Sequence, residues 1–182
     1  MMKSMIFLSL IAACLSTHPD LHAQVPGRLD GQWKLVPEKS ASIDPWGQIN
    51  LEIRTDGNHV TVVKRYSAGH VVDRRVDSMT VNTEGREELV PVSPGRWLGQ
   101  VSMGVYYGPG TMRRVQARMN DSRNELQINA LETVQTAQGS CETDVKETFT
   151  VSSDGGTLQW SETRSTRKSG PPLTYVFART AQ

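Results

Sequence analysis

Apolar and polar residues alternate along most of the chain beyond residue 24, as they do in strands that bury one face. The clearest example is the stretch 49–54, which reads Ile-Asn-Leu-Glu-Ile-Arg. The residues that follow, Asp-Gly-Asn at 56–58, are typical of a hairpin turn because Gly and Asn accept positive φ angles. Beyond residue 24 the sequence lacks sustained helical periodicity. The pattern therefore predicts an all-β, antiparallel protein.

The alternation recurs about ten times, with turn residues between the segments. The segments that we expect to form strands are 32–35, 49–54, 59–66, 70–81, 87–92, 96–105, 111–119, 125–134, 141–151, 157–164 and 173–178. A meander of this length must close or pair its edge strands. We therefore expect a barrel of about 8–10 strands, with a two-sheet β-sandwich as the alternative.

The first 23 residues have the layout of a secretory signal peptide. Lys3 precedes a ten-residue apolar run at 6–15, and a polar segment leads to the bond between Ala23 and Gln24. The apolar run is shorter than the roughly 20 residues that span a bilayer as a helix. We expect cleavage after Ala23, export to the periplasm or the extracellular space, and a single domain over residues 24–182.

Cys14 offers an alternative to this cleavage. The sequence Ile-Ala-Ala-Cys at 11–14 matches a bacterial lipobox, after which the cysteine becomes a lipidated N-terminus. Cleavage after Ala23 is favoured because the apolar segment before Cys14 would be very short. A membrane-anchored lipoprotein remains the second possibility.

Loss of the signal peptide limits the chemistry of the remaining chain. Cleavage after Ala23 would leave 159 of the 182 residues, with His59, His70 and Cys141 as the remaining histidines and cysteine. This set cannot form an intramolecular disulfide or the usual four-ligand zinc sites, so we expect neither metal nor cofactor. The formal net charge of +1 argues against nucleic acid as a partner.

The segment 29–40, LDGQWKLVPEKS, resembles the opening of exported bacterial lipocalin-like (calycin) β-barrel proteins, which reads GxWKLxPxKS. The Asp-Gly turn at 153–156 and the closing segment 175–177 fit the same pattern. The resemblance implies that Trp33 packs across the closed end of a barrel. It also implies binding of a small, often apolar, ligand, and the motif carries no catalytic residue.

Four charged residues occupy positions that alternate in step with apolar residues of the same strand, so they are expected on the same face: Arg74, Glu132, Glu147 and Glu162. One interpretation is a polar-lined cavity in which Arg74 meets the glutamates and a polar ligand binds. The interpretation that we favour places these residues near strand ends or beyond a bulge, in solvent, because charged residues are rarely fully buried.

Four aromatic residues lie in or near predicted loops: Trp46, Trp97, Tyr106 and Tyr107. They would ring the mouth of a barrel and contact a ligand, as aromatic residues do in many binding sites. Alternatively they cap the core, whereas Trp33 and Trp160 are expected within it. We interpret the basic run around Arg113 as a solvated strand face.

The residue inventory offers no catalytic constellation, so we do not expect an enzyme. Our first hypothesis is an exported barrel that binds a small molecule in its lumen. The second is a non-catalytic structural or envelope-associated interaction protein with a filled core. Barrels of about eight strands accommodate either arrangement.

Overall fold

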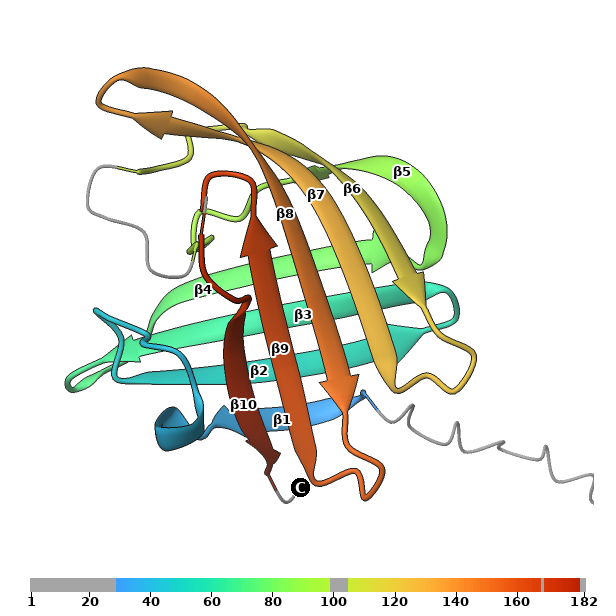
Figure 1. Ribbon diagram of the computed structural model, residues 1–182. Helices are drawn as coiled ribbons and strands as arrows, with labels where there is room; N and C mark the ends of the chain where they lie inside the picture. The colour runs from blue at the N-terminus through green and yellow to red at the C-terminus, as the bar shows by residue number, and fades with distance from the viewer. Residues whose placement is uncertain (1–28, 99–104, 168, 181–182) are drawn as a thin grey trace, which may run out of the picture.

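The computed structural model describes residues 29–98, 105–167 and 169–180. The predicted signal peptide and Cys14 lie outside the described residues. The described chain forms ten strands and a short 3-10 helix, η1 (Figure 1). Their bounds are β1 Gly31–Leu35, η1 Pro37–Lys39, β2 Gln48–Asp56, β3 His59–Ala68, β4 Val71–Asn82, β5 Glu84–Pro91, β6 Met112–Met119, β7 Glu125–Thr136, β8 Gly139–Val151, β9 Thr157–Arg164 and β10 Leu173–Arg179.

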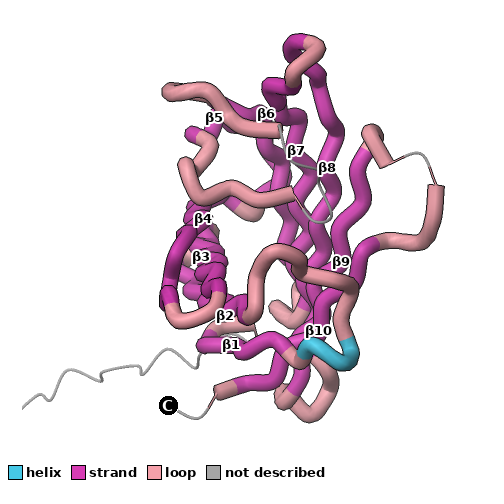
Figure 2. The backbone as a smooth tube through the Cα atoms, turned by 90° about the vertical axis from the view of Figure 1, so that its left-hand side faces the viewer, coloured by secondary structure: helices cyan, strands magenta, loops and turns pink. Residues whose placement is uncertain are grey.

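All ten strands belong to one antiparallel sheet, in the order β4-β3-β2-β1-β10-β9-β8-β7-β6-β5. β1 pairs with both β2 and β10, which joins the two ends of the domain. The sheet curls so that β1–β4 face β5–β10 across the core (Figures 1 and 2). β4 and β5 are the edge strands, and they follow one another directly in the chain. The result is a nearly closed barrel, which confirms the predicted fold class.

The segment after β5 helps to close the barrel by packing against β4. The Ser93 hydroxyl donates a hydrogen bond of 3.0 Å to the carbonyl of Val76. A Cβ atom on Gly95 would lie 1.7 Å from the same carbonyl oxygen, so only glycine allows this approach of the two backbones. The contact places the next residue, Arg96, with its side chain buried in the barrel.

The inward-facing side chains form one apolar core over most of the barrel. Trp33 and Trp160 are both fully buried, which confirms their predicted place in the core. The indole N–H of Trp33 donates a hydrogen bond of 3.1 Å to the carbonyl of Leu29, and the Arg179 guanidinium lies 4.0 Å from the centre of the indole ring. Trp33 therefore has both its apolar surface and its N–H satisfied.

One predicted strand is not observed. Residues 96–98 of the expected strand 96–105 form a loop, and residues 99–104 lie outside the described residues. The Arg96 N–H donates a hydrogen bond of 2.9 Å to the carbonyl of Ser93, so the backbone turns here instead of extending. The Ser-Pro-Gly sequence at 93–95 predicts this turn, but the residue types after it do not distinguish a loop at 96–98 from a strand.

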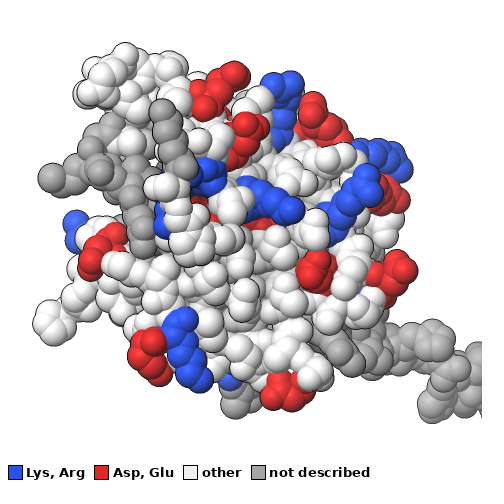
Figure 3. Space-filling model, in the orientation of Figure 1, with Lys and Arg blue, Asp and Glu red and all other residues white. Residues whose placement is uncertain are grey.

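The outer face of β5–β9 is polar and of mixed charge. Lys and Arg side chains are interspersed with Asp and Glu on the face shown in Figure 3, without a large area of one sign. Among the described residues, no helix has the length and apolar character needed to cross a bilayer.

Candidate functional site

Seven charged side chains lie buried inside the barrel, and we call them the interior ionic cluster. They are Lys64 from β3, Asp77 from β4, Arg96 from the loop after β5, Arg113 from β6, Glu132 from β7, Glu147 from β8 and Glu162 from β9. Each is at most 4% exposed. Burial of an ion costs several kcal/mol unless partners compensate, so their contacts determine what this interior can do.

Glu132 is the most heavily paired carboxylate of the cluster. One of its oxygens lies 3.1 Å from Arg96 Nη2 and 3.0 Å from Arg113 Nη1. The Tyr107 hydroxyl donates a hydrogen bond to its other oxygen. Burial alone would raise the pKa of Glu132, but Arg96 and Arg113 outweigh this effect and lower it. Glu132 is therefore ionised and ties three elements of the barrel together.

Glu147 is the second strongly stabilised carboxylate. Lys64 Nζ donates a hydrogen bond to it, and Arg96 Nη1 lies 3.4 Å from the same oxygen. Burial opposes ionisation, yet Lys64 and Arg96 lower the pKa of Glu147 to about 2. Lys64 Nζ also lies 4.1 Å from the ring centre of Trp160, so its ammonium is held by a carboxylate and an aromatic face together.

Arg96 connects the two halves of the barrel through three carboxylates. Besides Glu132 and Glu147, it contacts Asp77 on β4, with 3.5 Å between Nη1 and Oδ2. Burial would lower the pKa of Arg96, but these three carboxylates raise it well above its ordinary value. The loop that carries Arg96 is thus fixed to β4, β7 and β8.

Glu162 differs from the other carboxylates because its negative charge is weakly compensated. Its ion pair is with Arg164 at the end of β9, with 3.4 Å between Nε and Oε1. Neither oxygen accepts a hydrogen bond from the described residues. Burial, helped by Glu147, raises the pKa of Glu162 to about 7 against the attraction of Arg96 and Arg164. Glu162 therefore has acceptor capacity to spare.

A run of aromatic rings, which we call the aromatic cluster, borders the ionic groups. Its members are Trp46, Tyr66, Trp97, Tyr175 and Trp160. Successive ring centres lie 5.4, 5.5, 6.4 and 4.5 Å apart, and the last pair is stacked. The hydroxyls of Tyr66 and Tyr175 are buried without a hydrogen-bond partner among the described residues. The cluster is therefore an apolar surface with polar groups along it.

The structure overturns our favoured interpretation of the three glutamates. Glu132, Glu147 and Glu162 lie in the barrel interior and not in solvent. Arg74, in contrast, is exposed in β4, as the favoured interpretation placed it, so the alternative in which Arg74 meets the glutamates is wrong. The inward positions of β4 have the opposite parity and begin at Asp77, after a register shift between Tyr66 and Ala68 in the pairing with β3.

Two of the four predicted aromatic residues belong to the aromatic cluster, and a third contacts a glutamate. Trp97 is buried and Trp46 is partly buried within the aromatic cluster, and Tyr107 contacts Glu132. Tyr106 points away and is 61% exposed. Whether these residues contact a ligand stays a prediction.

The cations that accompany the glutamates were missed at the sequence level. They are Lys64, Arg96 and Arg113, and the interpretation of Arg113 as solvated is wrong because it is 1% exposed. Lys64 follows Val60 and Val62 with a period of two, so the alternation that marked the glutamates also marked this lysine. Arg96 had no such signal, because it comes from a loop.

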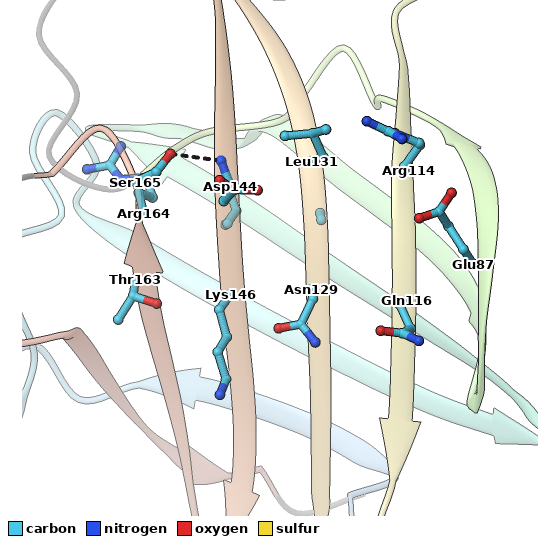
Figure 4. Close-up of a pocket in the computed structure, with 12 residues that line it drawn as sticks. Glu87, Arg114, Gln116, Asn129, Leu131, Asp144, Lys146, Thr163, Arg164 and Ser165 are labelled. Carbon is cyan, nitrogen blue, oxygen red and sulfur yellow. Dashed lines mark hydrogen bonds between the residues drawn. The ribbon is translucent and has the colours of Figure 1, made fainter.

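The outer face of β5–β9 carries a separate hollow of about 580 Å³. Figure 4 shows its polar lining, with Thr163, Lys146, Asn129 and Gln116 in a row across four strands. The Ser165 hydroxyl closes one side by accepting a hydrogen bond of 2.9 Å from the Asp144 N–H. This lining mixes opposite charges on the outer face, whereas the interior holds seven buried charged side chains among the described residues, so the barrel interior is the stronger candidate site.

These observations define a class: a nearly closed antiparallel β-barrel, which fits the lipocalin-like fold, with a buried ionic cluster beside aromatic rings. The chain matches no protein-family model and no curated protein sequence. It is similar to a solved structure described as "REP1-NXSQ fatty acid transporter", with a TM-score of 0.50 and 13% sequence identity. The match covers 85% of this chain and 97% of the other, and it supports the barrel fold.

Proposed function

We propose that this protein binds an amphipathic small molecule inside the barrel, in a non-catalytic role. The polar group of the ligand would meet the interior ionic cluster, and its apolar part would lie along the aromatic cluster. The observation that carries the proposal is a set of buried polar atoms that lack hydrogen-bond partners in the described part of the chain, including atoms of Asp77, Arg113 and Glu162.

Energetics supports a functional origin for the cluster. Replacing buried ion pairs by apolar side chains of similar volume is often neutral or stabilising. A barrel selected only for a filled core would therefore gain little from seven buried charges. Ligand sites, in contrast, combine apolar walls with a few convergent polar groups. The fold match to a protein described as a fatty acid transporter is consistent with a lipid-like ligand.

Native mass spectrometry of protein purified without denaturation from its own cells tests this proposal. We expect a small molecule that remains bound in the gas phase and is released when the protein is denatured. Protein prepared by unfolding and refolding without additives serves as the control and should have only the mass of the chain. Identical masses for the two samples would favour the alternative of a structural barrel with a filled core.

We further infer export, on the signal-peptide layout of residues 1–23. The intact mass of the mature protein tests this inference. Cleavage after Ala23 predicts a chain that begins at Gln24 and carries no lipid. A lipid-modified N-terminus at Cys14 would instead establish a membrane-anchored form, and an uncleaved chain in the cytoplasm would contradict export.

A further inference from the structure

Carboxylates outnumber cations by four to three in the interior ionic cluster itself, and the nearly buried Arg164 at the end of β9 supplies a further positive charge through its ion pair with Glu162. Among the described residues the cluster has Lys64, Arg96 and Arg113 against Asp77, Glu132, Glu147 and Glu162. All three cations already form ion pairs with carboxylates of the cluster, at Glu147, Glu132 and Asp77. An anionic ligand would therefore have to compete with buried carboxylates for the same cations.

Glu162 is the weakly paired carboxylate of the cluster, since Arg164 is its ion-pair partner but neither of its oxygens accepts a hydrogen bond from the described residues. It lies directly across from Glu147 in the pairing of β8 with β9, so two carboxylates are neighbours on the inner face. Lys64 and Arg96 both contact Glu147, whereas the ion pair of Glu162 is the longer one to Arg164 at the strand end. A positive charge placed beside Glu162 would relieve both the repulsion and the missing hydrogen bonds.

The surroundings of Glu162 suit an ammonium group. Trp160 precedes Glu162 by two residues on the same face of β9. Tyr175 lies opposite Trp160 on the neighbouring strand β10 and stacks on it. Aromatic faces attract cations, most strongly where water is excluded. The chain supplies its own example, since the Lys64 ammonium is held between Glu147 and the face of Trp160.

Arg113 is the group that would best support an anionic ligand instead of a cationic one. Its Nε and Nη2 atoms have no hydrogen-bond acceptor among the described residues. Its charge, however, is neutralised by Glu132 at 3.0 Å, so these N–H groups require only a neutral acceptor such as a hydroxyl. The ion pair of Glu162 with Arg164 is longer, at 3.4 Å, and Glu147 lies opposite Glu162, so the charge of Glu162 is less well compensated than that of Arg113.

We propose, building on the function proposed above, that the bound molecule is an amphipathic amine whose ammonium group is bound by Glu162 beside Trp160 and Tyr175. Its alkyl or other apolar part extends along Trp97 towards Trp46. Hydrogen bonds to a charged group are worth about 1.5–3 kcal/mol each, which makes the head group the main determinant of specificity.

Titration of the ligand-free mature chain with decylamine, decan-1-ol and decanoate at pH 8 tests this inference, because the three probes differ only in head group. Binding is followed by tryptophan fluorescence and confirmed by calorimetry. We expect decylamine to bind at least about tenfold more tightly than decanoate, which corresponds to about 1.4 kcal/mol, with the alcohol between them.

Two variants separate a role of Glu162 from general effects of its removal. Glu162→Gln keeps the shape of the side chain and should remove most of the preference for decylamine, while binding of decan-1-ol changes little. Glu142→Gln, on the exposed face of β8, is the matched control and should bind all three probes like the parent. Decanoate binding as tightly as decylamine, or a preference that survives Glu162→Gln, would overturn this inference alone. A lack of saturable binding by all three probes would overturn the proposed function as well.

Discussion

Replacing Glu132 by alanine is expected to lower the free energy of unfolding by about 3–5 kcal/mol, because it leaves buried cations without their counter-charge. Arg113 would lose its ion pair at 3.0 Å, and the Tyr107 hydroxyl would lose its acceptor. Arg96 would keep its contacts to Glu147 and Asp77. Urea denaturation monitored by tryptophan fluorescence measures the change.

Two companion variants make this result specific to the ionic cluster. Glu142→Ala removes an exposed carboxylate from β8 and should change the free energy of unfolding by no more than about 0.5 kcal/mol. Glu132→Leu combined with Arg113→Met removes both partners and should recover most of the loss. A Glu132→Ala variant as stable as Glu142→Ala would show that the buried pairs described here do not form.

The stability of the protein is expected to pass through a maximum near pH 5, for reasons that involve two neighbouring carboxyls. The pKa of Glu147 is lowered to about 2 from the ordinary 4.5, so its contribution exists above pH 4.5 and is lost as the pH falls towards 2. The pKa of Glu162 is raised to about 7, so the folded chain binds more protons than the unfolded chain between pH 4.5 and 7. Stability therefore falls as the pH rises through this second range.

The variant Glu162→Gln tests whether Glu162 causes the loss of stability between pH 4.5 and 7. The variant should be more stable than the parent at pH 8, by an amount on the order of 3 kcal/mol, and close to it at pH 5. Urea denaturation at pH 5, 6.5 and 8 measures the difference, with Glu142→Gln as the control. If Glu162→Gln lost stability with rising pH as steeply as the parent does, the assignment of this titration to Glu162 would be wrong.

The fold was predictable because it depends on a local and repeated pattern. Strand β9 was expected at 157–164 and is observed there, and the hairpin at 56–58 has Gly57 with a φ of 56°. Alternation also indicated that Glu132, Glu147 and Glu162 share a face with apolar residues. The rarity of buried charges led us to place these glutamates in solvent, because that general rule does not include the ion pairs that stabilise a buried carboxylate.

The partners could not be predicted because they come from distant parts of the sequence. Lys64 and Glu147 are 83 residues apart, and Arg96 and Glu132 are 36 residues apart. Pairing of this kind depends on how the sheet curls. Arg96 lies in the loop after the turn at 93–95, where alternation gives no direction for a side chain. Arg74 lies in solvent, as the favoured interpretation had it, because it has the opposite parity to the inward positions of β4.

A crystal structure of the protein with the tightest-binding of the three decyl compounds is the most direct test of the interior site. We expect the head group within hydrogen-bond distance of the interior ionic cluster and the alkyl chain against Trp97 and Tyr175. A ligand found instead in the outer hollow lined by Lys146 and Asn129, with the ionic cluster unchanged, would contradict the proposal that the barrel interior is the binding site.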